Sequence, residues 1–201
     1  RMTQVFPEEY LAEDFPEPVY TQLDVRHYFE RTDGGDFARQ DFYKKPDGYQ
    51  SAFMPYARQT DIYIPCHFWS DKSPLIFTRE DAKAEDFRIK LVSDISCDID
   101  GPVASTLRPS TIADPFYGYD PLSESEVEIG APNSIGVSAV DNLPCELPKD
   151  ASEDFGNELI KNVIPHFFNG DVDGILDRAS ETTLDGKLSP HFAYLADYVK
   201  D

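Results

Sequence analysis

Three aspartates follow one apolar segment of the chain closely. Asp94, Asp98 and Asp100 lie within SDISCDIDG, residues 93–101, directly after the segment IKLV, which has three apolar residues. In an open α/β sheet, ligands bind beyond the carboxyl ends of the strands, and carboxylates placed there can handle protons or bind a ribose. Asp and Gly also favour turns, so a turn without a chemical role is the competing interpretation.

Further polar side chains follow two other apolar segments. Cys66 and His67 come directly after DIYIP, and His67 is a candidate acid, base or neighbour of a cofactor. Asn142 follows SIGVSAV and precedes two prolines. Because prolines restrict the backbone, the amide of Asn142 is a candidate for binding a ligand in a fixed orientation. The alternative for Asn142 is that its side chain caps its own turn.

One arginine stands in a stretch rich in hydroxyl groups. Arg108 lies within STLRPST, residues 105–111, ahead of an Asp-Pro-aromatic sequence. A cation among hydroxyls suits a loop that binds a phosphate or the carboxylate of a substrate. The structural alternative, which we favour, is a surface ion pair of Arg108 with Asp114 or Asp120.

Spacing excludes several familiar sites. The stretch that begins at Ser96 mimics the first positions of an EF-hand loop, but Leu107 stands where calcium binding requires a Glu. An odd number of widely spaced cysteines makes neither a disulfide framework nor a zinc knuckle. The chain contains no G-x-S-x-G, Walker, H-E-x-x-H or G-x-G-x-x-G motif. The sequence therefore predicts no metal site.

Three short strands are expected to position these residues. Each is bounded by polar residues and rich in β-branched side chains, at 61–66, 89–95 and 135–140. Thr78 and Asp81 have the spacing of a capping box, which predicts a helix from Arg79 onward. Strand, helix and strand in this order predict a βαβ unit. We therefore expect an α/β fold with part of a Rossmann-type parallel sheet.

The two ends of the chain differ in character. Before the first strand, the sequence predicts a helix at 7–14, an ordered insertion at about 15–48 with turns at 33–35 and 46–48, and a helix or helical turn at 49–59. From Pro148, apolar side chains recur with helical spacing up to Phe167, and Asn169-Gly170 ends that helix. Shorter elements are then expected: a helix at 171–180, a turn at 184–188 and a helix at 191–199.

Composition limits the classes of partner. The formal net charge of −20 repels nucleic-acid phosphates and anionic lipid headgroups, so neither partner is expected. No apolar run approaches the ~20 residues of a membrane span, and the first residues lack the apolar part of a signal peptide. Together with the unpaired cysteines, these features predict a cytoplasmic protein.

Taken together, the polar stretches resemble the lysine-ketoglutarate reductase and saccharopine dehydrogenase family, which is grouped with alanine dehydrogenase and the transhydrogenase nucleotide domain. The most specific stretch is DNLPCELPKDASEDFGNEL, and SDISCDIDG and TLRPSTIADPF support it. The similarity extends from about residue 41 to residue 201. It is weak before residue 41.

The resemblance implies a domain layout. In this family a Rossmann cofactor domain is inserted within a split substrate domain. Residues 1–147 would be the C-terminal part of the cofactor domain, and the helical residues 148–201 would return to the substrate domain. The Gly-rich loop and the N-terminal lobe are expected in a missing N-terminal half of the same enzyme. Whether the chain is truncated, a proteolytic fragment or a complete gene product stays open.

The resemblance also assigns roles to single residues. Asp98 matches the active-site aspartate beside the nicotinamide, and Asn142 is expected to hold the carboxamide or a substrate oxygen. In Leu143, a leucine replaces the methionine of the family. The implied cofactor-binding positions are Cys66, His67, Ile95, Ser96, Cys97, Asp98, Asn142 and Leu143. The family's Lys and His that handle the substrate amine and proton belong to the missing lobe.

The implied activity is an NAD(P)-dependent oxidation or reduction at a C–N bond of an amino acid. In the lysine-pathway version, hydride reduces the imine of lysine and 2-oxoglutarate to saccharopine, and the reverse reaction oxidises saccharopine. Residues 1–201 alone are expected to be inactive and to bind NAD or NADP weakly, because they lack a phosphate-gripping helix N-terminus. The alternatives are an alanine dehydrogenase-like enzyme and a non-catalytic binding or assembly domain derived from a dehydrogenase half. Besides an amino-acid or 2-oxo acid substrate, a second copy of the chain is a candidate partner.

Overall fold

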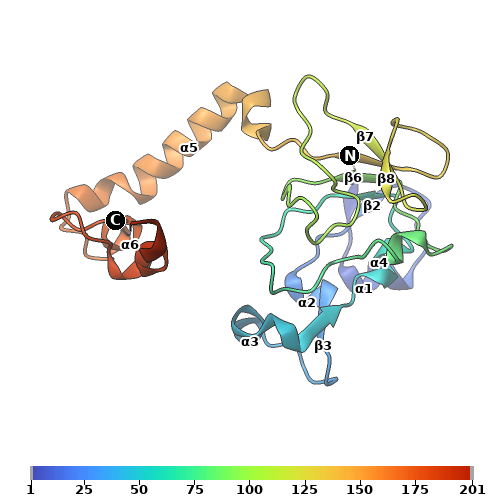
Figure 1. The fold of residues 1–201 in the computed structure, drawn as a ribbon, viewed down its shortest axis with the longest axis horizontal. Helices are drawn as coiled ribbons and strands as arrows, with labels where there is room; N and C mark the ends of the chain where they lie inside the picture. Colours follow the sequence, from blue (N-terminus) through green and yellow to red (C-terminus); the bar gives the residue numbers. More distant parts are fainter. Residues whose placement is uncertain (1, 200–201) are drawn as a thin grey trace. The chain divides into compact units, whose positions relative to one another are not determined.

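A computed structural model describes residues 2–199 of the chain as two compact units (Figure 1). The first unit ends at Leu143 and contains the strands, whereas the second begins at Pro144 and is helical. The assignment of the two units to a cofactor and a substrate domain stays a prediction.

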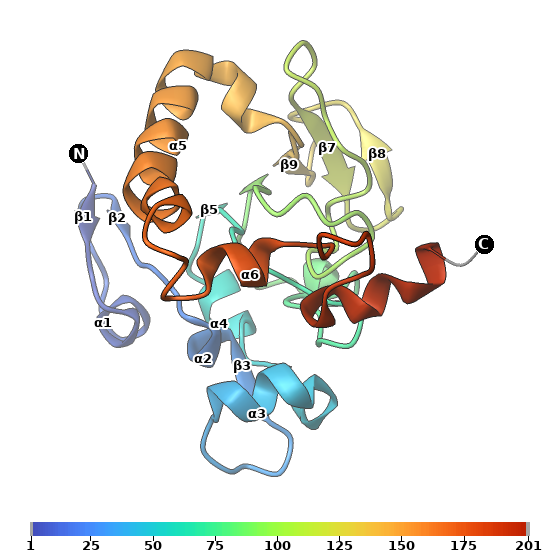
Figure 2. The ribbon, with the colours of Figure 1, turned by 90° about the vertical axis from the view of Figure 1, so that its left-hand side faces the viewer.

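The main sheet of the first unit has five strands in the order β5-β6-β9-β7-β8. Figure 2 labels β5, β9, β7 and β8 of this sheet. These strands are β5 (Ile62–Tyr63), β6 (Leu91–Ser93), β7 (Tyr117–Asp120), β8 (Ser125–Val127) and β9 (Ile135–Ser138). The strands β5, β6 and β9 are parallel, with Val92 opposite Val137. The strands β7 and β8 form an antiparallel hairpin beside β9. The fold is therefore mixed α/β.

The three predicted strands are confirmed, although each is shorter than its apolar run. The predicted parallel sheet is present in part: β5, β6 and β9 are parallel, and the β7–β8 hairpin, which comes between β6 and β9 in sequence, adds two antiparallel strands beside β9. Gly118, within β7, makes that hairpin close: a Cβ built there would lie 2.6 Å from the carbonyl oxygen of Glu128. Only a glycine permits such an approach of two backbones.

The helix predicted from Arg79 is wrong beyond a single 3₁₀ turn, η2 (Asp81–Lys83). Its expected cap does form, because the Thr78 N–H donates to the Asp81 carboxylate over 2.8 Å. Tertiary packing then ends the turn. The ring of Phe87 packs 5.2 Å from that of Phe77, centroid to centroid, which draws the chain into the core before it enters β6. No βαβ unit with a crossover α-helix results.

Short elements form the N-terminal part of this unit. They are β1 (Thr3–Gln4), α1 (Pro7–Ala12), β2 (Val19–Tyr20), α2 (Val25–Tyr28), β3 (Phe29–Arg31), α3 (Arg39–Lys44), η1 (Pro46–Gly48), β4 (Tyr49–Ser51) and α4 (Met54–Ala57). The helix predicted at 7–14 is confirmed as α1. The helical turn predicted at 49–59 is confined to α4, because β4 pairs antiparallel with β3 instead.

Aromatic side chains join these short elements to the sheet. The Phe29 and Phe42 rings lie 5.0 Å apart, and the Phe53 and Tyr63 rings lie 4.7 Å apart. Large buried aromatic rings supply much of the apolar area that stabilises a core. The insertion predicted at about 15–48 is thus part of the same apolar core as the sheet.

The second unit consists of α5 (Pro148–Asn162), η4 (Ile164–Phe167), α6 (Ile175–Ala179) and η5 (Pro190–Tyr198). The long helix predicted from Pro148 is confirmed as α5, and its first position suits proline. Its predicted end at Asn169-Gly170 is wrong, because α5 ends at Asn162 and the 3₁₀ helix η4 follows it. The expected α-helix at 191–199 is a 3₁₀ segment with a kink at Phe192. The turn predicted at 184–188 lies inside a bridge between Thr182 and Leu188. Among residues 144–199, no apolar side chain is buried.

Candidate active site at the carboxyl ends of β5, β6 and β9

Hydrogen bonds bring the segments that follow β5, β6 and β9 together. The Ile95 N–H donates to the carbonyl of Pro65 over 2.9 Å, and the Asp94 N–H donates to the carbonyl of Ser138 over 2.7 Å. The Cys97 thiol lies 3.2 Å from the carbonyl oxygen of Ala139. Because parallel strands share one carboxyl edge, residues from three distant parts of the sequence meet there.

One buried carboxylate organises the loop after β6. Asp94 is 1% exposed, and its Oδ1 accepts the N–H groups of Ser96 and Cys97 at 3.1 Å each and the Ser96 hydroxyl at 2.6 Å. Its Oδ2 accepts the hydroxyl of Thr106 at 2.6 Å. The sequence places Asp94 among the acids of this loop, but neither its central position nor that of Thr106 was predicted. The Asp-x-Ser spacing is the one local signal of such a turn.

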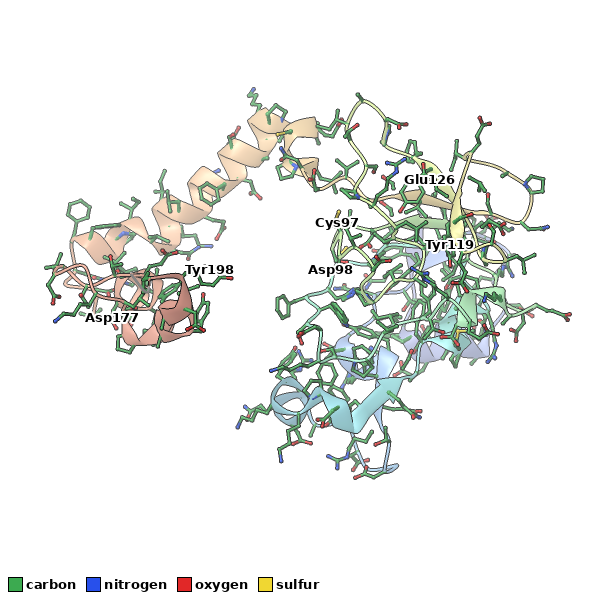
Figure 3. All side chains as sticks on the ribbon, viewed as in Figure 1. Cys97, Asp98, Tyr119, Glu126, Asp177 and Tyr198 are labelled. Carbon is green, nitrogen blue, oxygen red and sulfur yellow. The ribbon has the colours of Figure 1, made fainter. Side chains whose placement is uncertain are left out.

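The loop places Asp98 beside that buried charge. Cys97 and Asp98 are neighbours on the segment after β6 (Figure 3). Burial, followed by the charge of Asp94, raises the pKa of the half-buried Asp98 carboxyl. The same two causes, burial first, raise the pKa of the thiols of Cys66 and Cys97. A raised pKa keeps these groups protonated to a higher pH than in water.

His67 faces the same edge from the end of β5. Burial lowers the pKa of His67, and the charges of Asp94 and Asp98 partly oppose that shift. Its Nε2 is buried and has no hydrogen-bond partner. The ring of Tyr28, from α2, lies 6.3 Å from the imidazole, and burial raises the pKa of this tyrosine to about 12. The imidazole is therefore neutral near pH 7 and has one unused nitrogen.

Asn142 and Leu143 follow the end of β9 within the first unit. Asn142 is exposed, whereas Leu143 is half-buried and begins the 3₁₀ turn η3 (Leu143–Glu146). The charge of the adjacent Asp141 contributes to the raised pKa of Cys97, so this segment lies near the loop after β6. Within residues 2–199 no hydrogen bond joins Asn142 to Asp98, so the ligand-binding roles of Asn142 and Leu143 stay predictions.

Arg108 forms a structural contact with the β7–β8 hairpin. Its Nε and Nη2 donate to the two carboxylate oxygens of Glu126 at 2.7 and 2.8 Å. The guanidinium also lies 4.7 Å from the centre of the Tyr117 ring. The expected ion pair is thus present, but its predicted partners, Asp114 and Asp120, are wrong. The hairpin that carries Glu126 was not predicted, so this acid could not be chosen.

The first unit also carries side chains suited to a flat, partly apolar ligand. Ile95 and Ile99 are each about two-fifths exposed on the loop after β6, and Phe68 is almost fully exposed after β5.

Within residues 2–199, no three His, Cys, Asp or Glu side chains gather in a way that could hold a metal ion. No helix of that range is long and apolar enough to cross a membrane. The cytoplasmic location stays a prediction.

Comparisons with known proteins agree on one group of enzymes. Over 130 residues the chain is 28% identical to an alpha-aminoadipic semialdehyde synthase of Arabidopsis thaliana, which covers 61% of this chain and 12% of the relative. A mitochondrial alpha-aminoadipic semialdehyde synthase of Mus musculus is 29% identical over 157 residues, covering 69% of the chain and 17% of the relative. No protein-family model matches the chain.

A third relative is a saccharopine dehydrogenase (NAD⁺, L-lysine-forming) of Schizosaccharomyces pombe, 26% identical over 106 residues. This match covers 53% of the chain and 28% of the relative. The chain is related to a part of these enzymes. The resemblance to the saccharopine dehydrogenase family is therefore confirmed, for a chain that spans between 12% and 28% of the length of these three relatives.

Proposed function

We propose that this chain is part of an NAD(P)-dependent oxidoreductase of lysine metabolism that acts on the CH–NH group of an amino acid. The observation that carries the proposal is the similarity to both alpha-aminoadipic semialdehyde synthase and saccharopine dehydrogenase. The cluster of Asp98, His67 and Cys97 at the carboxyl edge of the parallel strands supports it, because such edges bind ligands in α/β proteins. An alanine dehydrogenase-like activity and a non-catalytic role are less favoured by these similarities.

The residues of this edge fit a nicotinamide dinucleotide. The half-buried Asp98 carboxyl offers a polar contact, and exposed Ile95 offers an apolar surface for a flat ring. We assign cofactor contacts to Cys66, His67, Ile95, Ser96, Cys97, Asp98, Asn142 and Leu143. When bound, NAD or NADP supplies or accepts the hydride, while the protein provides orientation and charge.

Within this proposal, Asp98 handles a proton. Its raised pKa makes the neutral carboxyl form persist to a higher pH than in an exposed aspartate, which suits an acid or base that changes state during turnover. Asn142 is exposed at the end of β9 and would orient an amide or a substrate oxygen. Holding both reactants in line would supply a large part of the rate.

The second unit fits a role as part of a larger substrate domain. A segment of 56 residues, 144–199, that buries no apolar side chain has no core of its own. Along α5 and η4, Phe155, Ile160 and Phe167 are each more than three-fifths exposed. An isolated element must bury such a face against another layer to be stable. We therefore assign residues 148–201 to the substrate domain of the complete enzyme.

A product assay on the polypeptide that carries this chain tests the proposed function. We expect consumption of NADH or NADPH with lysine and 2-oxoglutarate, or reduction of NAD⁺ or NADP⁺ with saccharopine. We expect Asp98→Asn to lower kcat by about 10²-fold or more, the typical contribution of a positioned acid or base. Asp100→Asn is the matched control, because this exposed aspartate of the same loop pairs with Arg79 on the surface.

Two other outcomes would overturn the proposal. Turnover of alanine, or of pyruvate with ammonia, in place of the lysine-pathway substrates would assign an alanine dehydrogenase-like activity. No turnover with either set, in a polypeptide that is folded and contains a Gly-rich phosphate loop, would favour the non-catalytic binding role instead.

A further inference from the structure

The loop after β6 has an unusual anchor. Asp94 is buried, yet within residues 2–199 no lysine or arginine forms an ion pair with it. A buried carboxylate is tolerated when its oxygens are satisfied by donors, and Asp94 accepts from two backbone N–H groups and two hydroxyls. Three of the four donors belong to Ser96 and Cys97, immediately before Asp98.

The anchored backbone adopts a conformation that it would not adopt freely. Cys97 has φ +52° and Asp100 has φ +49°, in the left-handed region that residues other than glycine rarely enter. Such conformations persist where the surroundings over-determine them, often at functional sites. At Cys97 the constraint is visible, because its N–H donates to Asp94 and its thiol faces the Ala139 carbonyl.

The fourth donor comes from a different part of the chain. Thr106 is fully buried, and its hydroxyl reaches Asp94 from a segment twelve residues further along. The hydroxyl of Tyr117, in β7, holds this segment in turn: it donates to the carbonyl of Ser105 at 3.1 Å and accepts the N–H of Leu107 at 2.9 Å. The hydrogen bonds therefore run from the hairpin through Thr106 and Asp94 to the loop.

We propose that Asp94 and Thr106 are positioning residues for the dehydrogenase site. The Thr106 hydroxyl fixes the orientation of the Asp94 carboxylate, and that carboxylate fixes the backbone of Ser96 and Cys97. This arrangement sets the direction in which Asp98 leaves the sheet. The role in the reaction rests on the proposed function, whereas the anchoring of the loop does not.

The test uses a matched pair of substitutions at the remote donor. Thr106→Val has nearly the same shape and lacks the hydroxyl, whereas Thr106→Ser keeps it. The readout is the rate at which N-ethylmaleimide labels Cys97 in the folded chain, followed by mass spectrometry of the peptide that contains it. Exposed Cys145 is the internal control, and urea unfolding of each variant gives the global stability.

We expect Thr106→Val to raise the labelling rate of Cys97 about tenfold, which corresponds to about 1.4 kcal/mol and is typical of a hydrogen bond to a charged group. Thr106→Ser should stay near the wild-type rate, and Cys145 should not respond. An unchanged Cys97 rate in Thr106→Val would overturn the proposal. So would a change of the same size as the change in the global unfolding constant, because that indicates general destabilisation only.

Asp94→Asn gives a second, independent readout. It removes the charge that contributes to the raised pKa of Asp98, so we expect the Asp98 carboxyl to titrate at a lower pH in a ¹³C NMR titration. An unshifted Asp98 titration in a folded variant would contradict the placement of Asp98 beside the Asp94 charge. In the dehydrogenase assay, Thr106→Val should lower kcat more than it changes the KM of the cofactor. If the wild-type protein shows no turnover, the proposed function fails while the labelling still decides the anchoring.

Discussion

Replacement of Arg108 separates a structural role from a substrate-binding role. The guanidinium makes two hydrogen bonds to Glu126 and lies over the ring of Tyr117. Both side chains of the ion pair are more than one-third exposed, at 36% and 44%, so solvent weakens their attraction. We expect Arg108→Met to destabilise the first unit by about 1–2 kcal/mol, the sum of an exposed ion pair and a cation–π contact.

Thermal unfolding followed by circular dichroism measures this effect. A loss of about 1–2 kcal/mol lowers Tm by roughly 2–4 °C per kcal/mol in a chain of this length. A double-mutant cycle with Glu126→Gln isolates the pair and should give a coupling of about 0.2–1 kcal/mol. Arg58→Met is the control, because Arg58 makes one exposed contact with Asp86 and should change stability by less than about 0.5 kcal/mol.

The kinetic result decides between the two roles. If Arg108 is structural, Arg108→Met leaves the KM of every anionic substrate within about twofold of the wild-type value at a temperature where the protein is folded. An unchanged Tm together with a tenfold higher KM for a substrate carboxylate would refute the structural interpretation. Arg108 would then have to leave Glu126 in the complete enzyme and bind the substrate.

Two further changes test the fold and the site. Gly118→Ala should destabilise the first unit by about 1–3 kcal/mol in urea unfolding, because its Cβ would lie 2.6 Å from the Glu128 carbonyl oxygen, whereas Gly48→Ala meets no atom within 4 Å and should be nearly neutral. His67→Phe should flatten the fall in stability below pH 6.5. The folded pKa of His67 lies below its ordinary 6.5, so the unfolded chain binds more protons as the pH falls through that window and wild-type stability declines there. Equal pH slopes for the two proteins would contradict the burial of this imidazole.

The parallel strands could be predicted because each has a local sequence pattern that is typical of a strand. Runs such as DIYIP and SIGVSAV are β-branched, short and bounded by polar residues, and the polar residues after them therefore had to share an edge. The hairpin was missed for the opposite reason. Its first strand reads YGYD, and a glycine in the middle of a short strand lowers the strand propensity of the sequence. In the folded chain this glycine is favourable, because it lets the backbone of Glu128 approach closely.

The centre of the site depends on contacts that no local pattern contains. Asp98 and His67 were identifiable as acid and imidazole at strand ends, and the structure places both near Asp94. The role of Asp94 itself depends on Thr106, whose buried hydroxyl arrives from another segment. Secondary-structure propensity describes neighbours in sequence, so a hydrogen bond across twelve residues lies outside what it can predict.

Two features of the loop after β6 lower the stability of the fold near neutral pH. Because the folded pKa of Asp98 lies above its ordinary value, the contribution of this carboxyl to stability is present at low pH and is lost as the pH rises through the folded pKa. A site selected for stability alone would place a neutral side chain beside buried Asp94. Left-handed backbone at Cys97 adds a further cost that the Asp94 hydrogen bonds must offset. Acids with a shifted pKa cluster at functional sites, and their combination with a strained, internally anchored backbone supports the proposal of a functional site on the loop after β6.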